Sequence, residues 1–158
     1  LQLPYFMGAE KAGTIEAAIL GAEKGTEWIK ICLDYYTDKT FIKQDSSLDI
    51  RKLPEIMVEE LEKFQPIHYL DVEEMKNIKN MDFQKEILVM PNEYFSPKIF
   101  DSREVLITPR TYAIHHYQNS WFSHKAKIYY RTRTILIRIL GYNFIQKTER
   151  ILMPSRFK

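Results

Sequence analysis

The first quarter of the chain contains two short apolar runs separated by turn-forming residues. Residues 3–8 (LPYFMG) form the first run, and residues 15–25 (IEAAILGAEKG) form the second, which has a glycine on either side of its apolar part. Brevity and flanking glycines favour a buried strand or another turn-bounded element for the second run, although residues 18–20 would also fit a helix. The pattern therefore predicts an extended N-terminal region.

Two helices are predicted next. Thr26 is a suitable N-cap for a helix that continues to about Tyr36. Pro54 suits the first turn of a second helix, which ends near Phe64 before the Gln-Pro pair. Between them, residues 43–52 are polar and loop-like. Two adjacent stripes would bury most of the first helix: Trp28, Cys32 and Tyr35, and Ile29, Leu33 and Tyr36. The second helix has its apolar face at Met57, Leu61 and Phe64.

The middle of the chain predicts two short strands and a final strand that ends in histidine. Residues 67–70 and 86–91 are the short strands, with an exposed helix or loop between them. A turn-rich aromatic connection then leads to residues 111–121 (TYAIHHYQNSW). Neighbouring side chains of a strand point to opposite faces, so one of the two histidines can face a cleft while the other packs or meets solvent. A strand that ends in histidines, amides, a hydroxyl and an indole is typical of the rim of a binding site.

The pattern changes again from about residue 122. Residues 123–141 predict a helix that ends at Gly141, and residues 143–153 predict a further short helix. At helical spacing the cations occupy a narrow arc: His124, Lys127, Arg131 and Arg138. Apolar side chains occupy another side of the same helix: Ile128, Ile135, Leu136, Ile139 and Leu140.

Composition changes this picture only in part. The chain has 158 residues, which is enough for one domain with a real core, and 45% of them are hydrophobic. The aromatic content of 13% suits a stiff core first, and stacking on a sugar or nucleotide second. The single cysteine, Cys32, excludes a disulfide framework and a cysteine-based zinc site, and it indicates a reducing compartment, the cytoplasm. We expect Cys32 to face the core.

Charge is distributed unevenly along the chain. Residues 1–121 carry 14 basic and 20 acidic side chains, a balance of −6, whereas residues 122–158 carry nine basic and one acidic, a balance of +8. An asymmetry of this size indicates an anionic partner for the C-terminal segment. Three interpretations remain: a solvated face on a helix that packs on the core, a surface for an anionic membrane, or a nucleic-acid surface, which usually spreads over more of a domain.

The sequence excludes several classes of protein or gives no support for them. The sequence has no signal peptide and no apolar run near the roughly 20 residues that span a bilayer. It has no P-loop, no dinucleotide-binding glycine motif and no nucleophile elbow. The chain begins abruptly and without methionine, so we expect a fragment of a longer protein.

Two pairs of residues are the candidates for chemistry. His115 and His116 could bind a metal ion, but carboxylate partners would have to come from elsewhere in the fold. The alternative is a histidine that hydrogen-bonds within the core or at its edge. Ser120 and Trp121 could donate to phosphate oxygens, or Ser120 could cap the following helix while Trp121 anchors it.

The chain resembles the C-terminal half of family 32 glycosyltransferases. Four segments carry the resemblance, in their order along the chain: IEAAILGAEKG, the helix ending in DYY, YFSPKIFDS and TYAIHHYQNSW. These bacterial sugar transferases build capsular polysaccharide and lipopolysaccharide, and they are related to yeast initiating mannosyltransferases. The resemblance covers most of residues 3–121, with 111–121 as its most specific part. It implies an α/β nucleotide-sugar transferase domain of the GT-A type, here its C-terminal portion (residues 1–121), followed by a basic amphipathic helical tail (residues 122–158).

The resemblance also implies ligands and roles. A divalent ion, Mn²⁺ or Mg²⁺, would bridge the donor diphosphate to the carboxylates of a DxD motif and to a C-terminal histidine. His115 is the better match for that histidine and His116 the second choice. Ser120 and Trp121 match the pair near the donor phosphates. Gly21 and Ala22 match the part beside the sugar and acceptor pocket, where a small residue permits close approach.

This sequence departs from the family in lacking a DxD motif, which in the family lies upstream of the region that matches residue 1. The expected function is therefore that of a metal-dependent, retaining hexosyltransferase of surface-polysaccharide assembly, whose piece present here is inactive alone. Its partners would be a nucleotide-sugar donor, a saccharide acceptor and the inner face of the cytoplasmic membrane, with no nucleic acid. The alternative function is a non-catalytic module that binds anionic lipid or nucleic acid through its basic helix.

Overall fold

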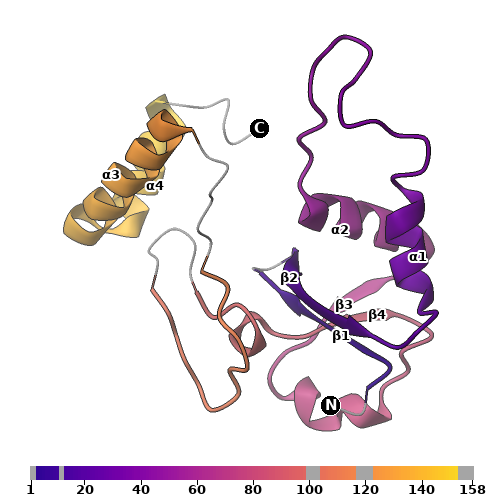
Figure 1. Cartoon of the computed structure of the whole chain (residues 1–158). Helices are drawn as coiled ribbons and strands as arrows, with labels where there is room; N and C mark the ends of the chain where they lie inside the picture. The colour runs from indigo at the N-terminus through magenta and orange to yellow at the C-terminus, as the bar shows by residue number, and fades with distance from the viewer. Residues whose placement is uncertain (1–2, 11–12, 99–103, 117–122, 153–158) are drawn as a thin grey trace. The chain divides into compact units, whose positions relative to one another are not determined.

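The computed structural model describes residues 3–10, 13–98, 104–116 and 123–152, which form two compact units. The first unit comprises residues 1–97 and 107–115, and the second comprises residues 98–106 and 116–158. Both contain helices, and the strands lie in the first, so the fold is mixed α/β (Figure 1). The predicted boundary between residues 121 and 122 lies outside the described residues. The sequence did not predict that residues 98 and 104–106 group with the C-terminal helices.

The strands of the first unit form two pairs joined by a bridge. β1 (Tyr5–Ala9) pairs antiparallel with β2 (Ile15–Ala22), and β3 (Ile67–Tyr69) pairs parallel with β4 (Ile87–Val89). A parallel bridge between Gly8 and Met90 connects the pairs. Two backbone hydrogen bonds support it, from Ala9 N to Met90 O at 2.8 Å and from Met90 N to Met7 O at 2.9 Å. The backbone order across this layer is therefore β2-β1-β4-β3, and the strand predictions for all four segments are confirmed.

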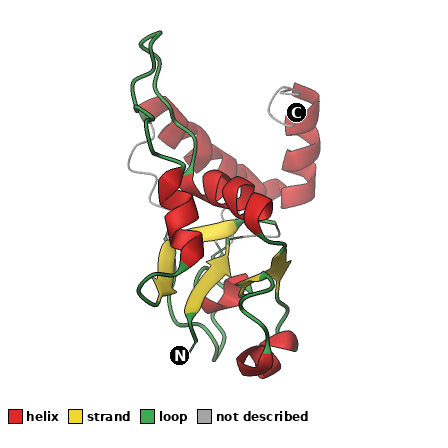
Figure 2. Cartoon of the chain, turned by 90° about the vertical axis from the view of Figure 1, so that its right-hand side faces the viewer, coloured by secondary structure: helices red, strands yellow, loops and turns green. Residues whose placement is uncertain are grey.

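Each face of the strand layer carries its own core. Helices α1 (Glu27–Asp34) and α2 (Leu53–Phe64) cover one face, while the 3-10 helix η1 (Glu74–Asn80) lies on the other (Figures 1 and 2). Alternate residues of β1 and β4 point to opposite cores, as the period of two requires. The first core contains Tyr5, Met7, Ala9, Ile15, Trp28, Cys32, Met57, Leu61, Ile87 and Val89. The second contains Leu70, Met75, Ile78, Leu88, Met90 and Phe95.

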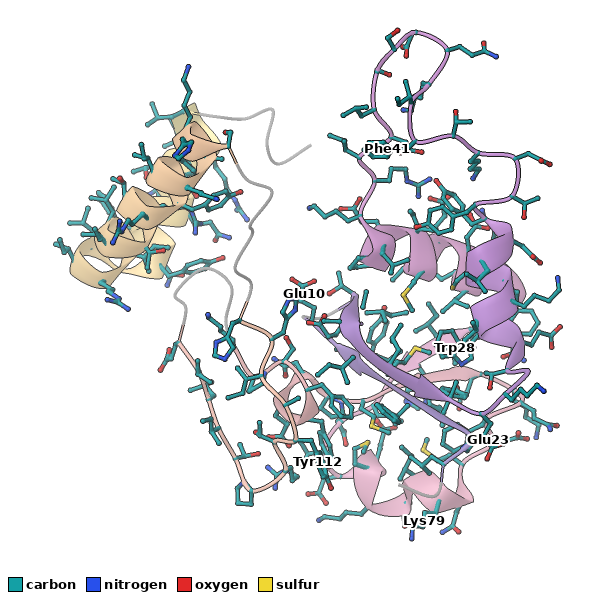
Figure 3. All side chains as sticks on the ribbon, in the orientation of Figure 1. Glu10, Glu23, Trp28, Phe41, Lys79 and Tyr112 are labelled. Carbon is teal, nitrogen blue, oxygen red and sulfur yellow. The ribbon has the colours of Figure 1, made fainter. Side chains whose placement is uncertain are left out.

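Helix α1 confirms half of its predicted pattern. Trp28 and Cys32 are buried in the first core, where Trp28 lies between the helix and the strand layer (Figure 3). Burial raises the pKa of the Cys32 thiol to about 11. In the second predicted stripe Ile29 is partly buried against this core, whereas Leu33 and Tyr36 are exposed and retain 64% and 48% of their surface. The helix packs against α2 along one side only. Thr26 occupies the N-cap position, but its hydroxyl donates to Glu23 O at 2.7 Å instead of capping the helix.

Helix α2 begins as predicted, with Pro54 in its first turn. Ile56, Met57 and Leu61 are buried, whereas Phe64 at the end of the predicted apolar face is 37% exposed. The residues between α1 and α2 form a long loop whose tip is a short hairpin with Phe41 on it (Figure 3). This loop accounts for the polar stretch that the sequence placed there.

The histidine segment is not a strand, so the prediction of a strand at residues 111–115 is wrong. Residues 111–116 have no regular secondary structure. The N–H groups of Tyr112 and Ala113 both donate to one carbonyl, Tyr94 O, at 2.8 and 3.3 Å. Two donors that share one acceptor cannot continue a strand ladder, in which each residue has its own partner. The β-favouring residues of this run therefore pack against the connection that contains the short 3-10 helix η2 (Asn92–Tyr94).

The second unit contains a helical hairpin. Helix α3 (His124–Leu140) and helix α4 (Tyr142–Leu152) are joined at Gly141, whose φ of 85° favours glycine. Ser123 is the N-cap of α3 and accepts a hydrogen bond from Ala126 N at 3.3 Å. Both helices were predicted. None of the helices in the described residues has the length and the apolar character needed to cross a membrane.

One histidine of the first unit lies between two carboxylates. His68 Nε2 is 3.0 Å from Glu74 Oε1, and its Nδ1 is 3.3 Å from Glu86 Oε2. Partial burial disfavours the charged ring, but the hydrogen bond to Glu86 and the charge of Glu74 outweigh it and raise the pKa of His68. His68 therefore stabilises the fold most when it is protonated.

The His68→Gln variant is expected to lose more stability at mildly acidic than at alkaline pH. A pKa raised by folding gives a contribution that is fully present below the unfolded value of about 6.5 and is lost as pH rises through the folded value. The loss should be under about 1 kcal/mol because the groups are about one-third exposed. Urea unfolding at mildly acidic and at alkaline pH measures it. Glu86→Gln should shrink the same pH dependence, and a loss independent of pH would contradict the assignment.

Candidate functional site

A buried carboxylate lies near the start of β2. Glu16 is only 2% exposed, although it follows Ile15 in an otherwise apolar run. A buried carboxylate needs hydrogen-bond donors, because transfer out of water is otherwise costly. Within the described residues three groups donate to it: Ala18 N to Oε1 at 2.8 Å, Ser96 Oγ to Oε2 at 2.9 Å, and His115 Nδ1 to Oε2 at 2.9 Å. Glu16, Ser96 and His115 are called the Glu16 cluster below.

An irregularity of β2 creates the position of Glu16. In the register Gly8 faces Glu16 while Met7 faces Leu20, so residues 17–19 have no partner on β1. This bulge takes Ala18 N out of the ladder, and the Glu16 carboxylate accepts its hydrogen bond. Bulges often re-aim a side chain beside a functional site. Here the bulge gives the carboxylate a donor from its own strand.

Ser96 is fixed by its backbone as well as its hydroxyl. The residue is completely buried, and its N–H donates to Asn92 O at 2.8 Å. The preceding Phe95 is buried and stacks on Phe6 of β1, with ring centroids 5.3 Å apart. The Ser96 hydroxyl therefore approaches Glu16 from a rigid segment, which leaves the carboxylate little freedom to turn.

His115 forms the outer edge of the Glu16 cluster. Its side chain is 34% exposed, whereas that of Glu16 is 3% exposed. An ionised carboxylate only accepts hydrogen bonds, so this contact assigns the proton of a neutral His115 ring to Nδ1. The lone pair of the neutral ring is then on Nε2. A carboxylate that orients a histidine in this way is the usual partner of a metal-binding imidazole and also of a histidine that accepts a proton.

The segment that carries His115 is held by its neighbours. Thr111 Oγ1 donates to Glu93 O at 2.9 Å, and the Tyr112 ring stacks on Tyr94 with centroids 6.2 Å apart. Arg110 forms a two-point ion pair with the Glu93 carboxylate, and the hydrogen bond from the guanidinium lowers the pKa of Glu93. Tyr112 lies at the edge of the first unit (Figure 3). These contacts bring His115 to a glutamate 99 positions earlier in the chain.

The other predicted donor-site residues are not in the Glu16 cluster. His116 belongs to the second unit, where it is exposed and its carbonyl accepts a hydrogen bond from Lys98 Nζ at 2.7 Å. The sequence predicted that the two adjacent histidines have different surroundings because they point to opposite faces of a strand. Their surroundings do differ, but because His115 belongs to the first unit and His116 to the second. Ser120 and Trp121 lie outside the described residues, so their predicted phosphate contacts stay a prediction.

Gly21 and Ala22 lie at the far end of β2 from Glu16. Gly21 is five positions after Glu16, a distance of up to about 16 Å along an extended strand. A Cβ added to Gly21 would be 2.0 Å from Phe6 Cε1, so the aromatic ring occupies the space beside this glycine. Gly21 thus has a packing reason to be glycine. Its predicted role beside a sugar pocket, and that of Ala22, stays a prediction.

The Glu16 cluster offers an oriented imidazole, but the described residues hold no complete metal site. Within residues 3–10, 13–98, 104–116 and 123–152, no three histidine, cysteine, aspartate or glutamate side chains gather in a way that could hold an ion. Transition metals and Mn²⁺ accept imidazole together with carboxylate oxygens. His115 fits such an ion as a single ligand, and the remaining ligands would have to come from a substrate or from residues outside this set.

Sequence reasoning found His115 and missed its two partners. The sequence contains one sign of Glu16: it is a charged residue directly after Ile15 in an apolar run. A charged side chain in a buried strand requires a partner. Ser96 left none, because a serine before a proline in an aromatic connection is typical of a turn. Comparisons with protein-family models, with curated proteins and with solved structures gave no match to this chain.

Proposed function

We propose that this chain is the C-terminal part of a metal-dependent glycosyltransferase that resembles family 32 and has a GT-A-type catalytic domain. The enzyme would transfer a hexose, with retention, from a nucleotide-sugar donor to a growing capsular polysaccharide or lipopolysaccharide. It would act in the bacterial cytoplasm at the inner face of the membrane.

One observation carries this proposal. Three of the segments on which the resemblance rests, far apart in the sequence, each contribute one member of the Glu16 cluster: Glu16 from 15–25, Ser96 from 94–102, and His115 from 111–121. The convergence supports a shared role for the three segments. The alternative, a non-catalytic module that binds through its basic helices, gives this buried cluster no task beyond stability.

The Glu16 cluster suits the departure of a nucleoside diphosphate. A bound Mn²⁺ or Mg²⁺ would supply charge neutralisation for that leaving group. Glu16 holds the proton of a neutral His115 on Nδ1, which makes Nε2 the ring atom that would bind the ion, while Ser96 keeps the carboxylate in position. Ser120 and Trp121 would add a hydroxyl and an indole N–H to the phosphate oxygens, and Gly21 and Ala22 would lie beside the sugar and its acceptor.

The test is turnover of a panel of nucleotide sugars by the protein as the cell makes it, with Mn²⁺ and with a chelator. Metal-dependent hydrolysis or transfer with one donor supports the proposal. His115→Ala should then lower metal-dependent turnover by about 100-fold, whereas His116→Ala is the matched control and should change it little. Normal metal-dependent transfer by His115→Ala contradicts the ligand assignment. Failure of a folded protein to turn over any donor contradicts the function.

A further inference from the structure

The outer face of α3 carries an exposed stripe of three isoleucines. Ile128, Ile135 and Ile139 retain 66%, 52% and 71% of their surface. At 100° per residue they lie within about 40° of one another. Ile137 is the buried residue of α3 and lies on the side opposite the stripe. The stripe is therefore not the face by which α3 packs on α4.

The helical hairpin is held together without this stripe. Ile137 is the buried residue of α3 and Ile145 that of α4, and each is 6% exposed. Arg133 donates to Glu149 at 2.7 and 3.0 Å, and Tyr129 donates to the same carboxylate at 2.6 Å. Arg133 and Ile137 lie on the side of α3 opposite the isoleucine stripe, so these contacts hold the hairpin from that side.

Cations lie along one side of the isoleucine stripe. At helical spacing Lys127, Arg131 and Arg138 fall within about 40° of one another and next to the stripe. Residues 123–152 contain seven lysines and arginines and one acidic residue, Glu149, which Arg133 engages. The hairpin surface is therefore positive, and on α3 its positive strip borders an apolar one.

This combination selects one kind of partner. A surface helix that carries branched apolar side chains beside Lys and Arg is typical of helices that lie in the interface of a bilayer. Anionic headgroups complement the cations, and the acyl boundary below them receives the isoleucines. A nucleic acid would engage the cations, but its phosphate contacts give no reason for three exposed isoleucines.

We propose that the outer face of α3, formed by Ile128, Ile135 and Ile139 with Lys127, Arg131 and Arg138, docks on an anionic membrane with the isoleucines inserted at the headgroup level. The proposal goes beyond the transferase function, because it concerns the second unit and would hold for a protein with another activity. It assigns the surface and the orientation: the long axis of α3 parallel to the membrane plane.

Vesicle binding of the full chain tests the contribution of the cations. The probes are vesicles of phosphatidylcholine alone and of phosphatidylcholine mixed with an equal amount of phosphatidylglycerol. The protein should bind the anionic vesicles but not the neutral ones, and the binding should weaken as salt is added. Replacing Lys127, Arg131 and Arg138 with glutamine should weaken binding about 100-fold, at about 1 kcal/mol for each cation. The matched control replaces three exposed lysines of the first unit: Lys52, Lys76 and Lys85.

A fluorescent label tests insertion. Since Cys32 is buried and is the sole cysteine, an Ile135→Cys variant can be labelled there with a polarity-sensitive dye. Its emission should shift to the blue on anionic vesicles, whereas a dye on Ile50→Cys in the first unit should not shift. Replacing Ile128 and Ile139 with serine should weaken binding, with circular dichroism confirming that the helices remain.

Three results would overturn the proposal: absence of binding to anionic vesicles, binding that the cation variant retains, or binding without a blue shift at position 135. The last would mean attachment by charge alone. Equal binding of the wild-type chain and the isoleucine variant to a polynucleotide, with none to vesicles, would identify a nucleic-acid surface instead. Each result is independent of sugar transfer, so it leaves the transferase proposal to its own test.

Discussion

Replacing Glu16 with alanine is expected to lower the free energy of unfolding of the first unit by about 3 kcal/mol. The change leaves Ala18 N, the buried Ser96 hydroxyl and His115 Nδ1 without their shared acceptor. Each buried donor left unsatisfied costs about 1–3 kcal/mol, and relaxation with entry of water offsets part of that sum. Urea unfolding followed by circular dichroism measures the loss. Glu23→Ala, at an exposed residue just beyond the end of the same strand, is the control and should cost little.

The Glu16→Gln variant separates stability from orientation. Its amide oxygen can still accept from Ala18 N, while its NH2 group replaces Oε2 and donates to Ser96 Oγ and His115 Nδ1. A neutral His115 must then accept at Nδ1 and carry its proton on Nε2. The expected loss of stability is about 1 kcal/mol, because the hydrogen bonds are exchanged and not deleted.

Nitrogen NMR of labelled histidines reports the tautomer directly. In the wild-type chain His115 should carry its neutral-form proton on Nδ1, and in Glu16→Gln it should carry it on Nε2, with the signals of His116 unchanged. A His115 ring that keeps its proton on Nδ1 in the variant would show that Glu16 does not orient it. The carboxylate would then be a buried structural group, and its part in the proposed function would be lost.

The elements of the fold could be predicted because each depends on local pattern. Pro54 and the spacing of Met57 and Leu61 specify α2, and the short apolar runs specify β3 and β4. The predictions that are wrong concern segments whose structure or burial depends on tertiary contacts. Residues 111–115 have strand composition, but their donors share the Tyr94 carbonyl. Leu33 and Tyr36 lie on an apolar stripe that nothing in the described residues covers enough to bury.

The sequence predicted one member of the candidate site, His115, but not its partners Glu16 and Ser96. His115 is visible because a histidine pair after an apolar run is uncommon, but nothing in the sequence links it to Glu16, 99 residues earlier. The position of Glu16 depends on a bulge of β2, and a bulge is a matter of register between two strands. Ser96 depends in turn on the packing of Phe95 against β1. Register and packing are long-range properties, which periodicity does not encode.

Replacing Gly21 with alanine is expected to destabilise the first unit by about 2 kcal/mol, because the new methyl group would overlap the Phe6 ring. The ring cannot move freely, since it stacks on Phe95. Gly21 does not have the positive φ of Gly13, Gly25 and Gly141, so strain of the backbone is not the cause. Chemical denaturation of the single variant measures the loss.

A second variant shows whether Phe6 is the reason for Gly21. Phe6→Leu removes the ring atoms that meet the new methyl group, at a cost of its own. In that background Gly21→Ala should be neutral or stabilising by up to about 1 kcal/mol, because alanine restricts the unfolded chain more than glycine does. Gly25→Ala is the control: its φ of 85° makes alanine strained in either background, so Phe6→Leu should not rescue it.

The same pair of variants decides between packing and substrate approach at Gly21. If the double variant is no less stable than Phe6→Leu and transfers sugar equally well, the glycine is required by the aromatic ring alone, and its predicted place in the substrate pocket is wrong. If stability is rescued but transfer falls well below that of Phe6→Leu, a methyl group at position 21 obstructs the substrate itself. Stability and turnover measured on the same four proteins therefore separate two explanations that predict the same result for the single variant.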